Sequence, residues 1–159
     1  MHDGYLFTLG ICGSADEDDP APDLLSALLG ALPPVKRAAF LGKLGPDQSD
    51  QLLAEVVADM ADAELIVIVA PATTPQLPAR LTTLLHNAAT VNLGGRYAVV
   101  ITVGPHASAV LHQLRTAAAS CGFIIAGAYA MADSSSPPLA EVRAAYVAAR
   151  TALAPNALP

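Results

Sequence analysis

The heptapeptide Glu64–Ala70, ELIVIVA, restricts the possible folds more than any other stretch of the sequence. Four of its seven residues are β-branched, which favours a strand. Apolar residues occupy both alternating sets of positions, so a strand here hides both of its faces from water. The run therefore predicts a central strand of a parallel sheet that carries helices on both sides.

The rest of the chain alternates between strand-like and helix-like segments. The expected strands are Tyr5–Ile11, Val35–Leu41, Glu64–Ala70, Arg96–Val103 and Phe123–Tyr129. The expected helices are Asp23–Leu32, one capped by Ser49, one opened by Pro78, Ala107–Cys121, and Pro138–Leu153. Such alternation predicts a three-layer α/β fold with a five-stranded parallel sheet. Two basic residues in the second segment mark it as an edge strand.

Composition limits the class of protein. The 159 residues fit one domain, 1–159, in which we expect 154–159 to be a frayed tail. With 53% hydrophobic and only 14% charged residues, the chain is expected to fold and to cover apolar surface by self-association. The longest apolar run, Leu65 to Ala72, is too short to span a bilayer, and no secretory signal is readable. We therefore expect a cytoplasmic protein without membrane contact.

Charge and cysteine usage exclude further classes. The net charge is −6, and the eight Lys and Arg residues are scattered, so no basic stripe for nucleic acid exists in the sequence. Cys12 and Cys121 lack metal-ligand spacing and are expected to be reduced thiols. Neither Gly-x-Ser-x-Gly nor Gly-x-Gly-x-x-Gly follows a strand, so neither a hydrolase nucleophile nor a Rossmann dinucleotide site is indicated.

The first strand leads through Gly13-Ser14 into a helix, an arrangement that often holds a phosphate. Acidic residues fill the turn from Asp16 to Asp19. Two unit charges ~5 Å apart repel by roughly 3 kcal/mol at an effective dielectric near 20. Either the acids oppose a bound phosphate, or they point to solvent at the helix start and leave the Gly13 and Ser14 N–H groups free. A divalent cation is a third reading, although the run lacks regular ligand spacing.

Four stretches, in order and spacing, resemble the NADPH-dependent FMN reductase family over roughly residues 5 to 130. They are LGICGS, ADAELIVIVAPATTPQLPARLTTLLHNA, LGGRYAVVITVG and SCGFIIAGAYA. The resemblance implies a flavodoxin-like fold with strand order 2-1-3-4-5. It also implies an FMN-dependent NAD(P)H oxidoreductase, similar to flavin and quinone reductases, that forms a homodimer or homotetramer.

In that family the flavin lies over the ends of the first, third and fourth strands. The resemblance therefore implies that FMN is bound by Gly13, Ser14, Ala15, Pro71, Ala72, Thr73, Thr74, Gly104, Pro105 and His106. NAD(P)H would be the co-substrate, beside a small electron acceptor. Hydride transfer by a flavin requires no protein acid or base, so no catalytic side chain and no metal are expected.

The sequence also departs from the family. Asp16 stands about where an Arg is usual, and Ala72, Thr73 and Thr74 stand where an aromatic residue is common. Thr82 and His86 replace the usual Lys and Asp of the following helix. These departures favour an alternative function, a flavodoxin-like protein that has lost FMN and serves as a binding or assembly module. The sequence leaves both functions open.

Overall fold

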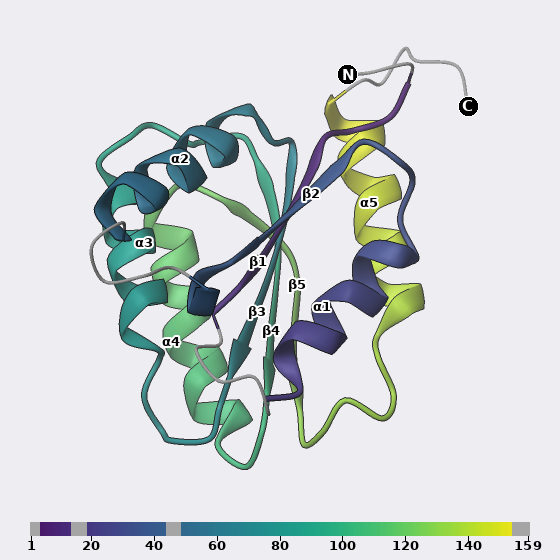
Figure 1. Ribbon diagram of the computed structural model, residues 1–159. Helices are drawn as coiled ribbons and strands as arrows, with labels where there is room; N and C mark the ends of the chain where they lie inside the picture. The colour runs from purple at the N-terminus through teal and green to yellow at the C-terminus, as the bar shows by residue number, and fades with distance from the viewer. Residues whose placement is uncertain (1–3, 14–18, 44–48, 154–159) are drawn as a thin grey trace.

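The computed structural model describes residues 4–13, 19–43 and 49–153, and within them five strands form one sheet in the order β2-β1-β3-β4-β5 (Figure 1). The strands are β1 (Thr8–Cys12), β2 (Lys36–Phe40), β3 (Leu65–Pro71), β4 (Tyr97–Val103) and β5 (Ile124–Met131). Every neighbouring pair is parallel. The predicted strand order and the edge position of the second strand are confirmed.

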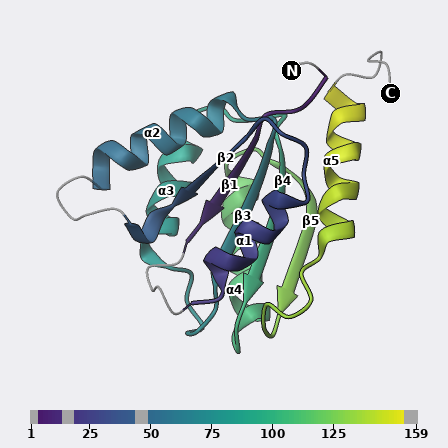
Figure 2. The same cartoon turned by 45° about the vertical axis from the view of Figure 1, so that its right-hand side comes forward.

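Helices cover both faces of the sheet, as the alternation predicts. They are α1 (Ala21–Gly30), α2 (Ser49–Asp62), α3 (Ala79–Ala89), α4 (Ala107–Ser120) and α5 (Leu139–Leu153), with a short 3-10 helix, η1 (Leu41–Lys43). Helices α1 and α5 lie on one face, and α2, α3 and α4 lie on the other (Figure 2). None of the helices in the described part of the chain has the length and apolar character to cross a membrane.

Strand β3 is buried along its whole length, which explains its composition. Ile66, Ile68 and Ala70 belong to the core on the α2, α3 and α4 side. Leu65, Val67 and Val69 belong to the core on the α1 and α5 side. Alternating residues thus bury apolar area in two separate cores, which is why both sets of positions are apolar.

Several element boundaries differ from the sequence prediction by one to three residues, the largest difference being that β1 begins at Thr8 rather than at Tyr5. Helix α1 begins at Ala21 rather than at Asp23, because Pro22 in the first helical turn needs no hydrogen bond from its nitrogen. Strand β5 continues to Met131 rather than ending at Tyr129, because it pairs with β4 as far as Val103. A register shift interrupts that pairing between Ala98 and Val99, and β5 is a half-exposed edge strand. An irregular edge is less able to pair with a foreign strand.

Candidate functional site

The loops that follow β1, β3 and β4 begin side by side at the carboxyl ends of the strands. The Gly13 N–H donates to the Val69 carbonyl at 2.9 Å, and the Ala72 N–H donates to the Val103 carbonyl at 2.8 Å. The Gly104 N–H donates to the Met131 carbonyl at 2.9 Å. These bonds extend the sheet by one residue beyond each strand. The expectation that the Gly13 N–H is free for a ligand is therefore wrong, since the neighbouring strand uses it.

The loop after β4 is held against the loop after β3. Gly104 has φ of +138°, and a Cβ added to it would lie 2.7 Å from the Ala72 carbonyl oxygen. Only glycine permits this approach and this backbone conformation. The His106 N–H also donates to the Ala72 oxygen, at 2.9 Å. Ala72 itself is fully buried, so it supports the loops from beneath.

A pocket of about 330 Å³ opens between the ends of β1 and β3 and the start of α3. Its volume is near the lower end of the range for small-molecule sites, roughly 300–1,000 Å³. The lining residues are Gly13, Asp19, Pro71, Thr73, Thr74, Gln76, Leu77, Pro78 and Ala79.

The structure brings four of the predicted site residues to this pocket: Gly13, Pro71, Thr73 and Thr74. Ala72 is buried behind them, and Gly104, Pro105 and His106 are not among the lining residues. Ser14 and Ala15 lie outside the described residues, as does the acidic run from Asp16 to Asp18.

The polar groups of the pocket are mainly uncharged donors. Thr73 and Thr74 are exposed, and the Thr74 Oγ1 accepts a hydrogen bond from the Gln76 N–H at 3.4 Å. Ala79 is the first residue of α3, and the first N–H groups of a helix lack intrahelical acceptors and favour negative charge.

Asp19 contributes a carboxylate to the same pocket. Its Oδ1 accepts a hydrogen bond from the Ala21 N–H at 2.9 Å, so it orders the chain just before α1. Among the nine lining residues it is the charged one, and no cation balances it there. The described lining therefore combines neutral donors and a helix N-terminus with one negative charge.

Gln113 is a structural member of the site that the sequence reasoning missed. Its Oε1 accepts from the Leu77 N–H at 3.1 Å, and its Nε2 donates to the Pro75 carbonyl at 2.7 Å. One amide from α4 thus holds the segment that borders the pocket. A half-buried glutamine on a helix has no local sequence signal for this role, because its partners lie 36 and 38 residues away.

The remaining candidate side chains play structural or surface roles. Cys12 is fully buried at the end of β1 and belongs to the core on the α1 and α5 side. His86 and His112 are exposed on α3 and α4. In the described ranges no three His, Cys, Asp or Glu side chains gather as a group that could hold a metal ion.

A family model described as NADPH-dependent FMN reductase matches residues 8–137. Among curated proteins, no sequence matches the chain.

Solved structures show the same fold. An NADH:FMN oxidoreductase (EMOB) in its apo form is similar with a TM-score of 0.70 and 16% identity, over 92% of this chain and 89% of that chain. FerB, a flavoenzyme NAD(P)H:(acceptor) oxidoreductase from Paracoccus denitrificans, has a TM-score of 0.62 and 14% identity, over 76% of this chain and 74% of that chain. A mutant flavodoxin from Pseudomonas aeruginosa has a TM-score of 0.56 and 20% identity, over 88% of this chain and 99% of that chain. These likenesses establish a flavodoxin-like fold.

Proposed function

The chain belongs to the NADPH-dependent FMN reductase family, a family of flavin-dependent reductases, and on that premise we propose that it is an FMN-dependent oxidoreductase. NADH or NADPH supplies the electrons, and a small molecule accepts them. The observation that carries the proposal is the position of the pocket. Gly13 follows the last residue of β1, and Pro71 is the last residue of β3; between these two strands the strand order reverses. Open α/β sheets bind ligands at this switch point.

The residues present fit a flavin cofactor in their chemistry. Thr73 and Thr74 supply hydroxyl groups, Gln76 supplies an amide, and the start of α3 at Ala79 favours an anionic group. The resemblance adds Ser14 and Ala15 to this set. When bound, FMN supplies hydride transfer, while the protein supplies position and electrostatics.

The chain's own residues prepare the site in three ways. Gln113 holds the backbone at Pro75 and Leu77, so a ligand meets an ordered wall. Gly104 allows the loop after β4 to pack on Ala72, which fixes where Pro105 and His106 stand. Ordering these loops before binding reduces the entropy that a ligand must otherwise remove.

The Asp19 carboxylate favours a second function, the flavodoxin-like module without flavin. A negative charge in the pocket opposes the phosphate of FMN, and no lysine or arginine is among the described lining residues. Such a module would bind neither FMN nor a nicotinamide nucleotide at this end of the sheet.

Turnover of NADH or NADPH distinguishes the two functions. We expect the purified protein to oxidise one of them in the presence of FMN, with a rate that saturates as FMN is added. A Thr73→Val, Thr74→Val double variant should need more FMN for half-maximal rate. The control is Thr83→Val, because Thr83 lies on the exposed surface of α3 and its hydroxyl donates to the Ala79 carbonyl. A rate that does not depend on FMN would contradict the proposal.

A further inference from the structure

The charge of the candidate flavin pocket bears on which flavin it favours. FMN is riboflavin with a phosphate group at the end of the ribityl chain, so the two flavins differ by about two negative charges at neutral pH. Both carry the same isoalloxazine ring, and the ring performs the hydride transfer. A pocket that discriminates between them therefore does so through the groups that meet the ribityl chain and the phosphate.

Asp19 is the charged residue among the nine that line the pocket. Its Oδ1 accepts the Ala21 N–H at 2.9 Å, which fixes the carboxylate just before α1. A carboxylate has about four acceptor positions, so this one bond does not exhaust them. The hydroxyl groups of a ribityl chain can donate to such positions. Phosphate oxygens at neutral pH are negatively charged acceptors, which a carboxylate repels.

The other polar groups of the pocket are neutral. The Thr73 and Thr74 hydroxyls and the Gln76 amide can each donate and accept, which suits a chain of hydroxyl groups. The start of α3 at Ala79 adds a partial positive charge of about one half. That is less than the full negative charge of Asp19, so the described lining is negative on balance.

The two segments that line the pocket contain no lysine or arginine. The sequence has none before Lys36, so the connection from β1 to α1 cannot supply a cation to a phosphate. The stretch from 71 to 79 has none either. Arg80, the next residue, is not among the lining residues, and its Nη1 donates to the Leu41 carbonyl at 2.7 Å.

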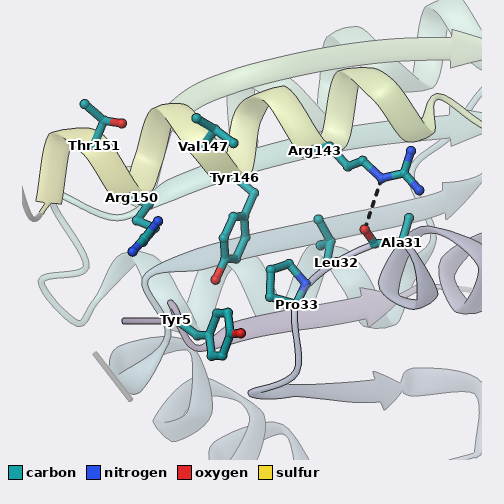
Figure 3. Close-up of a pocket in the computed structure, with 9 residues that line it drawn as sticks. All are labelled: Tyr5, Ala31, Leu32, Pro33, Arg143, Tyr146, Val147, Arg150 and Thr151. Atoms are coloured by element: carbon teal, nitrogen blue, oxygen red, sulfur yellow. Dashed lines mark hydrogen bonds between the residues drawn. The ribbon is translucent and has the colours of Figure 1, made fainter. Parts of the chain in front are cut away.

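Other basic side chains in the described part of the chain are bonded elsewhere. The Arg143 Nε donates to the Ala31 carbonyl at 3.2 Å, beside a second pocket that shares no lining residue with the candidate flavin pocket (Figure 3). Further pairs are Lys36 with the Leu29 carbonyl, Arg37 with Asp59, and Arg96 with the Ala61 carbonyl. None of these groups lines the candidate flavin pocket to offset the Asp19 charge.

We propose that this site prefers riboflavin, the uncharged flavin, to FMN, and that Asp19 is the residue that determines the preference. Asp19 accepts a hydrogen bond from a ribityl hydroxyl group and repels the phosphate of FMN, which binds with lower affinity. The inference rests on the proposed reductase function, because it specifies which flavin that same site selects.

The test compares riboflavin and FMN in titrations of the purified protein at low salt, followed by flavin fluorescence. We expect riboflavin to bind about tenfold more tightly than FMN. Added salt should strengthen FMN binding and leave riboflavin binding nearly unchanged, because ions screen the repulsion between the phosphate and Asp19. An equal response of the two flavins to salt would overturn the preference by charge.

Two matched substitutions test the role of Asp19. Asp19→Asn removes the charge but keeps an oxygen for the Ala21 N–H. It should tighten FMN binding several-fold without tightening riboflavin binding, so that the tenfold ratio of affinities falls toward one. Asp62→Asn makes the same change at an exposed aspartate that ends α2, outside the pocket. This control variant should keep the ratio of the unmodified protein.

The outcomes separate the preference from the proposed function. FMN that binds as tightly as riboflavin, or equal effects of the two substitutions on the ratio, would overturn the preference while the proposed flavin site stands. If neither riboflavin nor FMN binds saturably, both the preference and the proposed function are overturned.

Discussion

The Cδ2 atom of Leu81 lies 2.9 Å from the position that a Cβ atom on Gly13 would occupy. Helix α3 therefore packs directly on the residue that follows β1, and only a glycine leaves room for this contact. Leu81 is fully buried, so this contact belongs to the core. The contact brings the start of α3 beside the ends of β1 and β3, where the candidate site opens.

Alanine substitutions at two glycines should differ in their cost. Gly13→Ala presses on the flexible end of Leu81 and should lower the free energy of unfolding by about 1–3 kcal/mol. Gly104→Ala presses on the Ala72 backbone at a φ of +138°, so we expect a loss of about 3 kcal/mol or more. Urea unfolding of both variants measures the difference. A smaller loss for Gly104→Ala than for Gly13→Ala would contradict the loop packing described.

Gln113 should affect FMN binding more than it affects global stability. Gln113→Ala removes the partners of the Leu77 N–H and the Pro75 carbonyl. The loss of about 1–2 kcal/mol should destabilise the ordered conformation of the loop more than the fold as a whole. We expect FMN affinity to fall several-fold with little change in melting temperature. Gln113→Glu keeps the acceptor for Leu77 but loses the donor to Pro75, so its affinity should be intermediate. Equal affinities for all three proteins would show that the loop does not need this amide.

Valine substitutions at two fully buried threonines should change the free energy of unfolding in opposite directions. The Thr8 Oγ1 has no hydrogen-bond partner among the described residues, whereas the Thr102 Oγ1 donates to the Ala107 carbonyl at 2.7 Å. Thr8→Val removes an unpaired buried hydroxyl and should raise the free energy of unfolding by about 1 kcal/mol. Thr102→Val removes this hydrogen bond to the Ala107 carbonyl and should lower the free energy of unfolding by about 1 kcal/mol. The same sign of change in chemical unfolding for both variants would refute this assignment of partners.

The free energy of unfolding should fall at alkaline pH because Cys121 is buried. Burial raises its pKa from 9.0 to about 11, and its thiol donates to the Leu85 carbonyl at 3.3 Å. Because the pKa is higher in the folded state, the associated stability is complete below pH 9 and is lost as the pH rises toward 11. The loss should amount to about 2 kcal/mol.

The variant that tests this pH dependence is Cys121→Ala. It should be less stable at neutral pH because it leaves a cavity, yet its stability should fall less between pH 9 and 11. Tyr146, whose pKa burial also raises, contributes to the alkaline loss in both proteins. Parallel stability curves for the two proteins over that range would contradict the prediction.

Apolar patterning predicted the fold because the sheet buries its three central strands, β1, β3 and β4. The apolar pattern of residues 64–70 predicts a strand that is buried on both faces, and β3 is buried along its whole length. The strand order followed from the resemblance, and the sheet of the structure confirms it. Self-association, a cytoplasmic location and the use of NADH or NADPH stay predictions.

The site was predictable only in outline, because long-range backbone pairing decides which groups remain available. The sequence placed Gly13 at the phosphate turn, but the bond from its N–H to Val69 depends on how β1 and β3 lie in register. The role of Gln113 likewise depends on α4 lying beside the loop after β3. Local sequence contains neither relationship.

Titration of the purified protein with FMN, followed by flavin fluorescence, tests the central claim most directly. We expect saturable binding, and we expect Asp19→Asn to tighten it several-fold, because this change removes the charge yet keeps an oxygen for the Ala21 N–H. A wild-type protein that millimolar FMN does not saturate, together with an Asp19→Asn variant that binds no better, would contradict the assignment of this pocket to a flavin.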